Sequence, residues 1–218
     1  MHNAIASMLA LSPDLAPCVP DLERAFALLR ASFRGGGKLL VCGNGGSAAD
    51  SEHIVGELMK GYLLRRPIPA AQRRRLTEGF PEVGAYLAEH LQGALPAISL
   101  VSQTSLLTAF ANDVAADMVF AQQVYGYGRR GDVLWGLSTS GTSRNVLHAL
   151  RVARATGLRT LGFTGPEGAA MAALCDVTLQ VPRASVAAIQ SGHQALYHAL
   201  CEMVEIDAFG APDESAPH

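Results

Sequence analysis

Two corners of the chain combine glycine with small polar residues in a pattern suited to anion binding. The more informative one reads LSTSGTS over residues 137–143, where an apolar run opens into a helical pattern. Backbone amides and the positive end of a helix dipole favour an anion at such a corner, and hydroxyl groups add hydrogen-bond donors without bulk. The corner is therefore predicted to be a phosphate cradle, whose hydroxyls come from Ser138, Thr139, Ser140 and Ser143 around Gly141.

The alternative interpretation of this corner is a simple helix cap. One serine or threonine is enough to cap a helix, so four hydroxyls with a glycine favour the cradle. The chain contains no GxxxxGK[ST] motif, which argues against a nucleoside triphosphate bound with magnesium. We expect a phosphorylated sugar as the ligand and no nucleotide cofactor.

The other corner reads GNGGSAAD over residues 43–50. Its glycines follow a GxGG spacing, which differs from the GxGxxG fingerprint of dinucleotide-binding proteins. Glycine lets a backbone approach a ligand closely, so the predicted ligand contacts are Asn44, Gly45, Gly46 and Ser47. Ser47 is also the predicted N-cap of the following helix.

That helix offers an imidazole and a carboxylate one turn apart, His53 and Glu57. Residues at i and i+4 share a helix face, so the alternative is an ordinary surface contact. Gln190 and His198 lie about two turns apart on one side of a later helical pattern. Groups of this kind serve proton transfer near neutral pH. His193, between them, is expected to be a solvated or interface histidine.

These residues are positioned by alternating strands and helices. The predicted strands are KLLVCG, AISLV, DVLWGL, LRTLGF and CDVTLQVP, and the clearest helices fall at about 19–33, 47–60, 105–111, 116–125 and 186–209. This alternation predicts an α/β fold with a doubly wound parallel sheet flanked by helices. Both corners then lie at the carboxyl ends of strands and can line one crevice.

The bulk composition narrows the classes of protein. A chain of 218 residues that is 49% hydrophobic and 17% charged suits one globular domain over 1–218. The net charge of −2 and the lack of a basic stripe argue against a nucleic-acid partner. No apolar run reaches the ~18–20 residues of a membrane span, and four scattered cysteines suit a reducing compartment. We expect a cytoplasmic protein.

Four separated motifs together resemble the landmarks of sugar isomerase (SIS) domain proteins, in the phosphoheptose isomerase branch. They are CGNGGSAADSEHIVGEL, AND, STSGTSRNV and IQSGHQALYHAL, and the resemblance spans about 19–209. It implies interconversion of sedoheptulose 7-phosphate with a heptose 7-phosphate through an enediol. It also implies a homotetramer whose active sites lie at subunit boundaries.

The resemblance also assigns roles to individual residues. Glu57 falls on the family's catalytic base and His198 on its acid. In some members the positions of His53, Glu57, Gln190 and His198 bind zinc, which makes zinc a candidate cofactor here. Asn112 and Asp113 resemble a pair near the substrate hydroxyls, although a helix stop is an equally natural interpretation of that pair.

Two departures from the family pattern stand out. The segment at about 67–95 is longer than the family's compact connection, and its two short amphipathic patterns predict an ordered helical insertion close to the mouth of the active site. Ala187, Ala188 and Ser191 replace residues that are usual beside Gln190. A frayed tail is expected at about 210–218.

A second class of function stays open beside the isomerase. A non-catalytic SIS protein, like the bacterial replication-initiation regulator of this branch, binds a protein partner and can retain site residues. A phosphosugar-sensing transcription regulator is disfavoured, because no helix-turn-helix segment precedes the first predicted strand.

Overall fold

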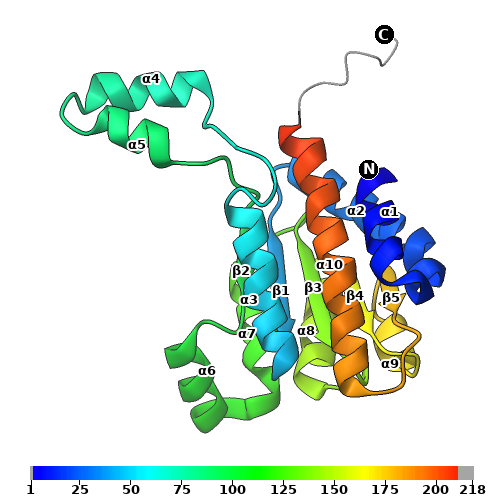
Figure 1. The fold of residues 1–218 in the computed structure, drawn as a ribbon. Helices are drawn as coiled ribbons and strands as arrows, with labels where there is room; N and C mark the ends of the chain where they lie inside the picture. The colour runs from blue at the N-terminus through cyan, green and yellow to red at the C-terminus, as the bar shows by residue number, and fades with distance from the viewer. Residues whose placement is uncertain (1, 211–218) are drawn as a thin grey trace.

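The computed structural model describes residues 2–210 and has one parallel β-sheet at its centre (Figure 1). The strands are ordered β2-β1-β3-β4-β5, and every adjacent pair is parallel. Their bounds are β1 Leu39–Gly43, β2 Ala97–Ser99, β3 Val133–Ser138, β4 Arg159–Thr164 and β5 Val177–Gln180. The predicted doubly wound α/β fold is confirmed.

Helices cover both faces of the sheet because successive strand residues point to opposite sides. Leu39 and Val41 enter the core beneath one helical layer, whereas Leu40 and Cys42 enter the core beneath the other. The first layer holds α1 His2–Leu11, η1 Pro13–Cys18, α2 Val19–Arg34, α3 Gly46–Met59 and α10 Val186–Phe209. The second holds α6 Thr104–Phe110, α7 Val119–Tyr127, α8 Arg144–Ala155 and α9 Ala169–Ala172.

The observed elements extend the sequence analysis in two places. Helix α1 was not predicted, yet Ala4, Ile5 and Met8 are buried in the first core. After α6 the chain continues through a π-helical turn, η2 Ala111–Ala115, and a short 3-10 turn, η3 Ala116–Met118. The bounds predicted for α10, about 186–209, are confirmed. The helix begins there because the Ser185 side chain caps its first turn by accepting a hydrogen bond from the amide of Ala188.

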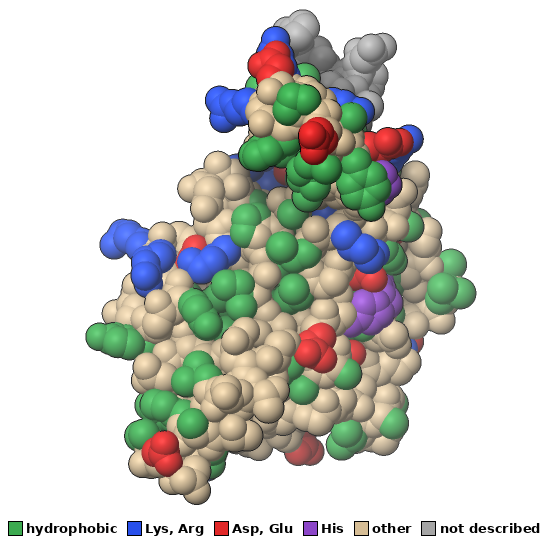
Figure 2. Space-filling view, turned by 90° about the vertical axis from the view of Figure 1, so that its left-hand side faces the viewer, with side chains coloured by type: hydrophobic (Ala, Val, Ile, Leu, Met, Phe, Trp, Pro, Cys, Tyr) green, Lys and Arg blue, Asp and Glu red, His purple; other side chains and the backbone are tan. Residues whose placement is uncertain are grey.

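The long segment between α3 and β2 contains two helices, α4 Ala70–Gly79 and α5 Gly84–His90, which form a hairpin that stands away from the sheet (Figure 1). No residue of α4 is buried. Figure 2 faces this side of the molecule and shows hydrophobic side chains gathered on the hairpin. The ordered helical insertion predicted at about 67–95 is thus present, but its side chains Phe80, Val83 and Tyr86 are 57%, 50% and 64% exposed and are not buried within the single chain.

No helix among residues 2–210 combines the length and the apolar composition that crossing a membrane requires. The tail expected at about 210–218 lies, beyond Gly210, outside the described residues.

Candidate functional site

The two corners are adjacent at the point in the sheet where the strand order changes direction, between β1 and β3. β1 and β3 are neighbours, but β1 leads into α3 on one face and β3 leads into α8 on the other. A crevice at the carboxyl ends of such strands is the usual ligand site of an open α/β sheet. The side-chain amides of Asn44 and Asn145 join the corners through two reciprocal hydrogen bonds of 2.9 Å. Asn145 was not singled out from the sequence, because only the fold brings it beside Asn44.

The second corner has free donors for an anion. Ser143 is the N-cap of α8, but its hydroxyl caps no amide of the helix and instead lies 2.9 Å from the Ser138 hydroxyl. The Ser140 hydroxyl accepts hydrogen bonds from the amide and the hydroxyl of Thr142, at 3.3 and 3.0 Å. It also lies 3.5 Å from the Ser138 hydroxyl, a long contact that a phosphate oxygen can replace. Thr139 is half-buried beside them. This arrangement supports the cradle over the simple cap.

Gly141 is required at this corner for two reasons. Its φ of +66° is in the left-handed region, and a Cβ there would lie 2.5 Å from the Cα of Gly168. The corner therefore packs backbone against backbone below the hydroxyls.

The first corner begins α3 in a different way from the prediction. Gly45, with φ 57°, is the N-cap of α3, so the assignment of Ser47 as the cap is wrong. Ser47 is buried in the first helical turn, and its carbonyl accepts a hydrogen bond from Ser51 at 2.7 Å. A Cβ on Gly46 would lie 2.4 Å from Nε2 of Gln190, so the Gln190 amide lies directly over this corner.

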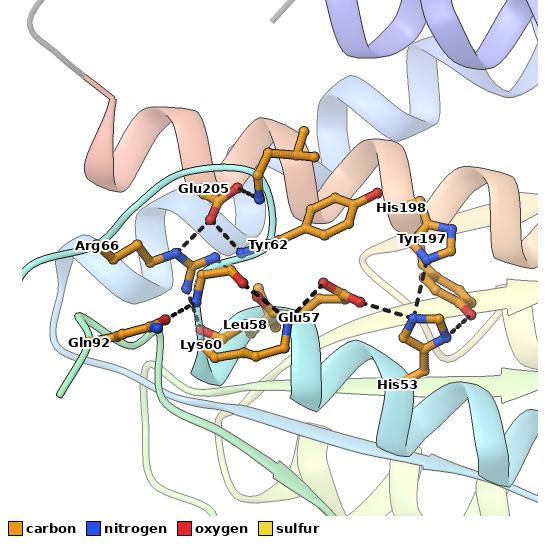
Figure 3. Close-up of polar contacts among 12 residues, drawn as sticks. His53, Glu57, Leu58, Lys60, Tyr62, Arg66, Gln92, Tyr197, His198 and Glu205 are labelled. Atoms are coloured by element: carbon orange, nitrogen blue, oxygen red, sulfur yellow. Dashed lines mark hydrogen bonds and ion pairs between the residues drawn. The ribbon is translucent and has the colours of Figure 1, made fainter. Parts of the chain in front are cut away.

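Further along α3 and α10, three candidate residues converge (Figure 3). Nε2 of His53 lies 3.0 Å from Oε1 of Glu57 and 3.3 Å from Nε2 of His198. One Nε2 proton cannot serve both partners at once, so the arrangement calls for a shared cation or a shared proton. Glu57 is buried, and its Oε2 has no hydrogen-bond partner among residues 2–210, although the Lys60 ammonium lies 4.0 Å from it.

Two residues that were not singled out from the sequence complete this cluster. The Tyr197 hydroxyl lies 3.0 Å from Nδ1 of His53 and donates to Oδ1 of Asp50 at 3.4 Å. This contact directs Nε2 of His53 toward Glu57 and His198. The Tyr62 ring stacks on the ring of His198, with centroids 5.8 Å apart and planes at 17°.

Burial decides the electrostatics of the cluster. Burial, followed by the nearby His53, lowers the pKa of His198, and Glu57 only partly offsets this. Burial also raises the pKa of Asp50 and of Tyr197. A neutral His198 has one donor and one acceptor nitrogen, which is the state that can both give and take a proton at neutral pH.

The donor set also fits a metal ion. One ligand atom from each of His53, Glu57 and His198 lies within 4.8 Å of the others. Two imidazoles and a carboxylate form a familiar zinc set that leaves a position open. Such an ion would satisfy Oε2 of Glu57, which has the Lys60 ammonium 4.0 Å away but no hydrogen bond among the described residues, and the doubly contacted Nε2 of His53. Gln190, by contrast, lies with the substrate corner at Gly46.

The cradle and the cluster are separated along the helices. At 1.5 Å per residue, Gln190 and His198 are about 12 Å apart on α10, and Gly46 and Glu57 are about 16 Å apart on α3. Asn112 and Asp113 are exposed in the π-helical turn and hydrogen bond to each other at 2.8 Å. Among the described residues, no hydrogen bond joins that pair to either group.

His193 is not the solvated histidine that the sequence analysis predicted. It is fully buried, and neither ring nitrogen has a hydrogen-bond partner among residues 2–210. Burial lowers its pKa to about 4. Its ring packs 5.7 Å from that of Phe163, so it belongs to the core.

Known proteins resemble this chain over nearly its whole length. The profile of the SIS domain family matches residues 19–79 and 76–165. A phosphoheptose isomerase of Burkholderia pseudomallei is 42% identical over 209 residues, which cover 96% of this chain and 91% of the relative. One of Rhodospirillum rubrum is 40% identical over 191 residues, or 88% of each chain. The solved phosphoheptose isomerase of Neisseria gonorrhoeae has a TM-score of 0.72 at 33% identity, over 92% of this chain and 94% of that one.

Proposed function

The chain belongs to the SIS domain family and, within it, to the phosphoheptose isomerases, and from this premise we propose that it interconverts sedoheptulose 7-phosphate and an aldoheptose 7-phosphate. The observation that carries this proposal is the pairing of a hydroxyl cradle at Ser138, Ser140 and Ser143 with a buried carboxylate and imidazole on the facing helices.

Glu57 is the proposed base of the isomerisation. Its carboxylate takes a proton from C1 of the ketose, which gives an enediol, and returns it to C2 to form the aldose. His198 moves the other proton between O2 and O1, for which a neutral imidazole is suited. Burial of Glu57 excludes water from the carboxylate and strengthens its interaction with the substrate.

His53, Glu57 and His198 are the residues that would hold a zinc ion. Gln190, the fourth candidate from the sequence, is about 12 Å from His198 along α10 and cannot complete this set within one chain. Bound zinc would supply a Lewis acid that polarises the carbonyl of the sugar. His53→Ala should reduce the stoichiometry of bound zinc, measured by atomic absorption, and an unchanged stoichiometry would remove His53 from the set.

The spacing of the groups supports a long sugar. Gln190 lies over the Gly46 corner and is about 12 Å from His198 along α10. A substrate that extends from the corners to the acid–base pair therefore needs several carbon atoms between its phosphate and its reacting carbons. The first corner is joined to the cradle corner by the Asn44–Asn145 hydrogen bonds and has the Gln190 amide over it. We propose that its residues bind the sugar hydroxyls: Asn44, Gly45, Gly46, Ser47 and Gln190.

We also propose a homotetramer in the cytoplasm. The exposed apolar side chains of the α4–α5 hairpin and the exposed pair Asn112 and Asp113 are suited to contact another subunit. Helix α10 has less apolar surface for such contacts, because its Leu196, Leu200 and Met203 are buried in the chain's own core. The four cysteines are free thiols, which suits a reducing compartment.

The test compares turnover of pentulose, hexulose and heptulose phosphates by product NMR in the wild type and in Glu57→Gln. We expect turnover of the heptulose phosphate, with kcat lowered about a hundredfold or more in the variant and KM little changed. No turnover of any ketose phosphate would overturn the proposal and favour the non-catalytic binding protein. Wild-type turnover in Glu57→Gln would overturn the assignment of the base.

A further inference from the structure

A buried ion pair joins the loop that follows α3 to α10, beside the proposed acid–base pair (Figure 3). Arg66 is 1% exposed and Glu205 is 0% exposed, and Nε of Arg66 donates to Oε1 of Glu205 at 2.7 Å. The residues are 139 positions apart in the chain. A buried ion pair is weak evidence for stability, because desolvation offsets the attraction between the charges. Its role is therefore sought in what the pair holds.

The guanidinium holds the last turn of the helix that carries the base. Nη2 of Arg66 donates to the carbonyl of Glu57 at 3.0 Å, and Nη1 donates to the carbonyl of Leu58 at 2.8 Å. Carbonyls in the last turn of a helix lack partners within that helix. Arg66 supplies partners from a buried side chain, whose guanidinium carbon also lies 4.7 Å from the centroid of the Phe209 ring.

The carboxylate holds the loop that follows the helix. Glu205 accepts hydrogen bonds from the amides of Tyr62 and Leu63 at 2.8 and 2.7 Å. Burial raises the pKa of Glu205, but these two amides and Arg66 outweigh it, so the net pKa lies below its usual range. By fixing the backbone of Tyr62, the carboxylate fixes the ring that stacks on His198.

Glu205 is seven residues, or about two helical turns, beyond His198 on α10. The ion pair thus connects the helix that carries the base to the helix that carries the acid, at one point on each. We propose that Arg66 and Glu205 are positioning residues, which together hold the Glu57 carboxylate and the Tyr62-covered His198 ring in register for proton transfer. This inference rests on the proposed roles of Glu57 and His198.

Substitution of each residue tests its half of the Arg66–Glu205 ion pair, called the clamp below. Glu205→Gln keeps the shape and one acceptor oxygen but removes the charge that binds the loop amides and Arg66. Arg66→Lys keeps the charge beside Glu205 but cannot reach all three acceptors, because one ammonium replaces the guanidinium fork.

Asp132→Asn is the matched control. Asp132 is also a buried carboxylate, and it accepts from the amides of Lys38 and Arg129 and from the ammonium of Lys38. None of these bonds reaches α3 or α10. The control therefore makes the same chemical change at a clamp that holds neither catalytic helix.

The assay is steady-state kinetics with sedoheptulose 7-phosphate on the full chain, well below the melting temperature of each variant. Misplacement of reacting groups costs up to about a hundredfold in rate. We expect kcat to fall at least about tenfold in Glu205→Gln and Arg66→Lys. KM should stay within about twofold, since the cradle lies at the corner between β3 and α8, away from the C-terminal end of α3 that Arg66 contacts. The kcat of Asp132→Asn should stay at the wild-type value.

Two patterns would overturn the inference. One is a kcat for Glu205→Gln and Arg66→Lys that equals that of Asp132→Asn per folded molecule. The other is a loss confined to KM. If Glu205→Gln does not fold, Arg66→Lys decides by the same criteria. Glu57→Gln distinguishes failure of this inference from failure of the proposed function. If Glu57→Gln is inactive while Glu205→Gln and Arg66→Lys are fully active, only this inference fails. If Glu57→Gln is fully active, the proposed base fails as well.

Discussion

Removal of single hydroxyls from the cradle tests its chemistry most directly. Ser138 is buried at the end of β3, with its hydroxyl 2.9 Å from that of Ser143, and Ser140 is exposed, with its hydroxyl 3.5 Å from that of Ser138. If each hydroxyl donates to a phosphate oxygen, then Ser138→Ala and Ser140→Ala each lose a hydrogen bond to a charged group. Such a bond contributes about 1.5–3 kcal/mol, which corresponds to roughly tenfold to a hundredfold weaker binding.

The assay is titration calorimetry with sedoheptulose 7-phosphate in the Glu57→Gln background, where binding is expected without turnover. Ser32→Ala is the control. The buried Ser32 hydroxyl donates to the carbonyl of Gly131, just before β3 and thus at the opposite end of the strand from Ser138. The Kd of Ser32→Ala should match the parent. Changes below about twofold in both cradle variants would refute the cradle, because the lost bond implies a larger effect.

Three further predictions concern pH, the hairpin and assembly. The pKa of His193 is about 4 in the folded chain and about 6.5 when unfolded, so its contribution to stability is complete above about pH 6.5 and is lost as pH falls toward 4. In urea titrations over this pH range, His193→Gln should lose less unfolding free energy than the wild type. Equal losses would contradict the burial argument. Replacing residues 69–90 with two glycines leaves Pro67 and Gln92, which form a β-bridge, close together. The deletion should change substrate preference or assembly more than the melting temperature, because α4 buries no residue. No change in kinetics, assembly or melting temperature would show that the hairpin has no role. Multi-angle light scattering should give a tetramer at micromolar concentration, and a monomer would refute it.

Much of the fold could be predicted from local sequence. Short apolar runs such as Leu39–Gly43 predict strands buried on both faces, and every residue of that strand is buried. Helix α10 could be bounded because a capping serine precedes it and Gly210 follows it. Helix α1 was missed because its apolar face has meaning only once the core beneath it exists.

The sequence by itself determined the two glycine corners, the hydroxyls of Ser138, Ser140 and Ser143, and the i, i+4 pair of His53 and Glu57, since each is a local pattern within one turn or corner. Local patterns carry no information about partners more than a hundred residues away.

Only the tertiary structure brought His198 to His53, Tyr197 to Asp50 and Arg66 to Glu205. It also decided that His193 is a core residue and that Gly45, rather than Ser47, caps α3. The physical reason is the same in each case: burial and hydrogen-bond partners depend on which helices pack across the sheet, and that packing is a property of the whole chain.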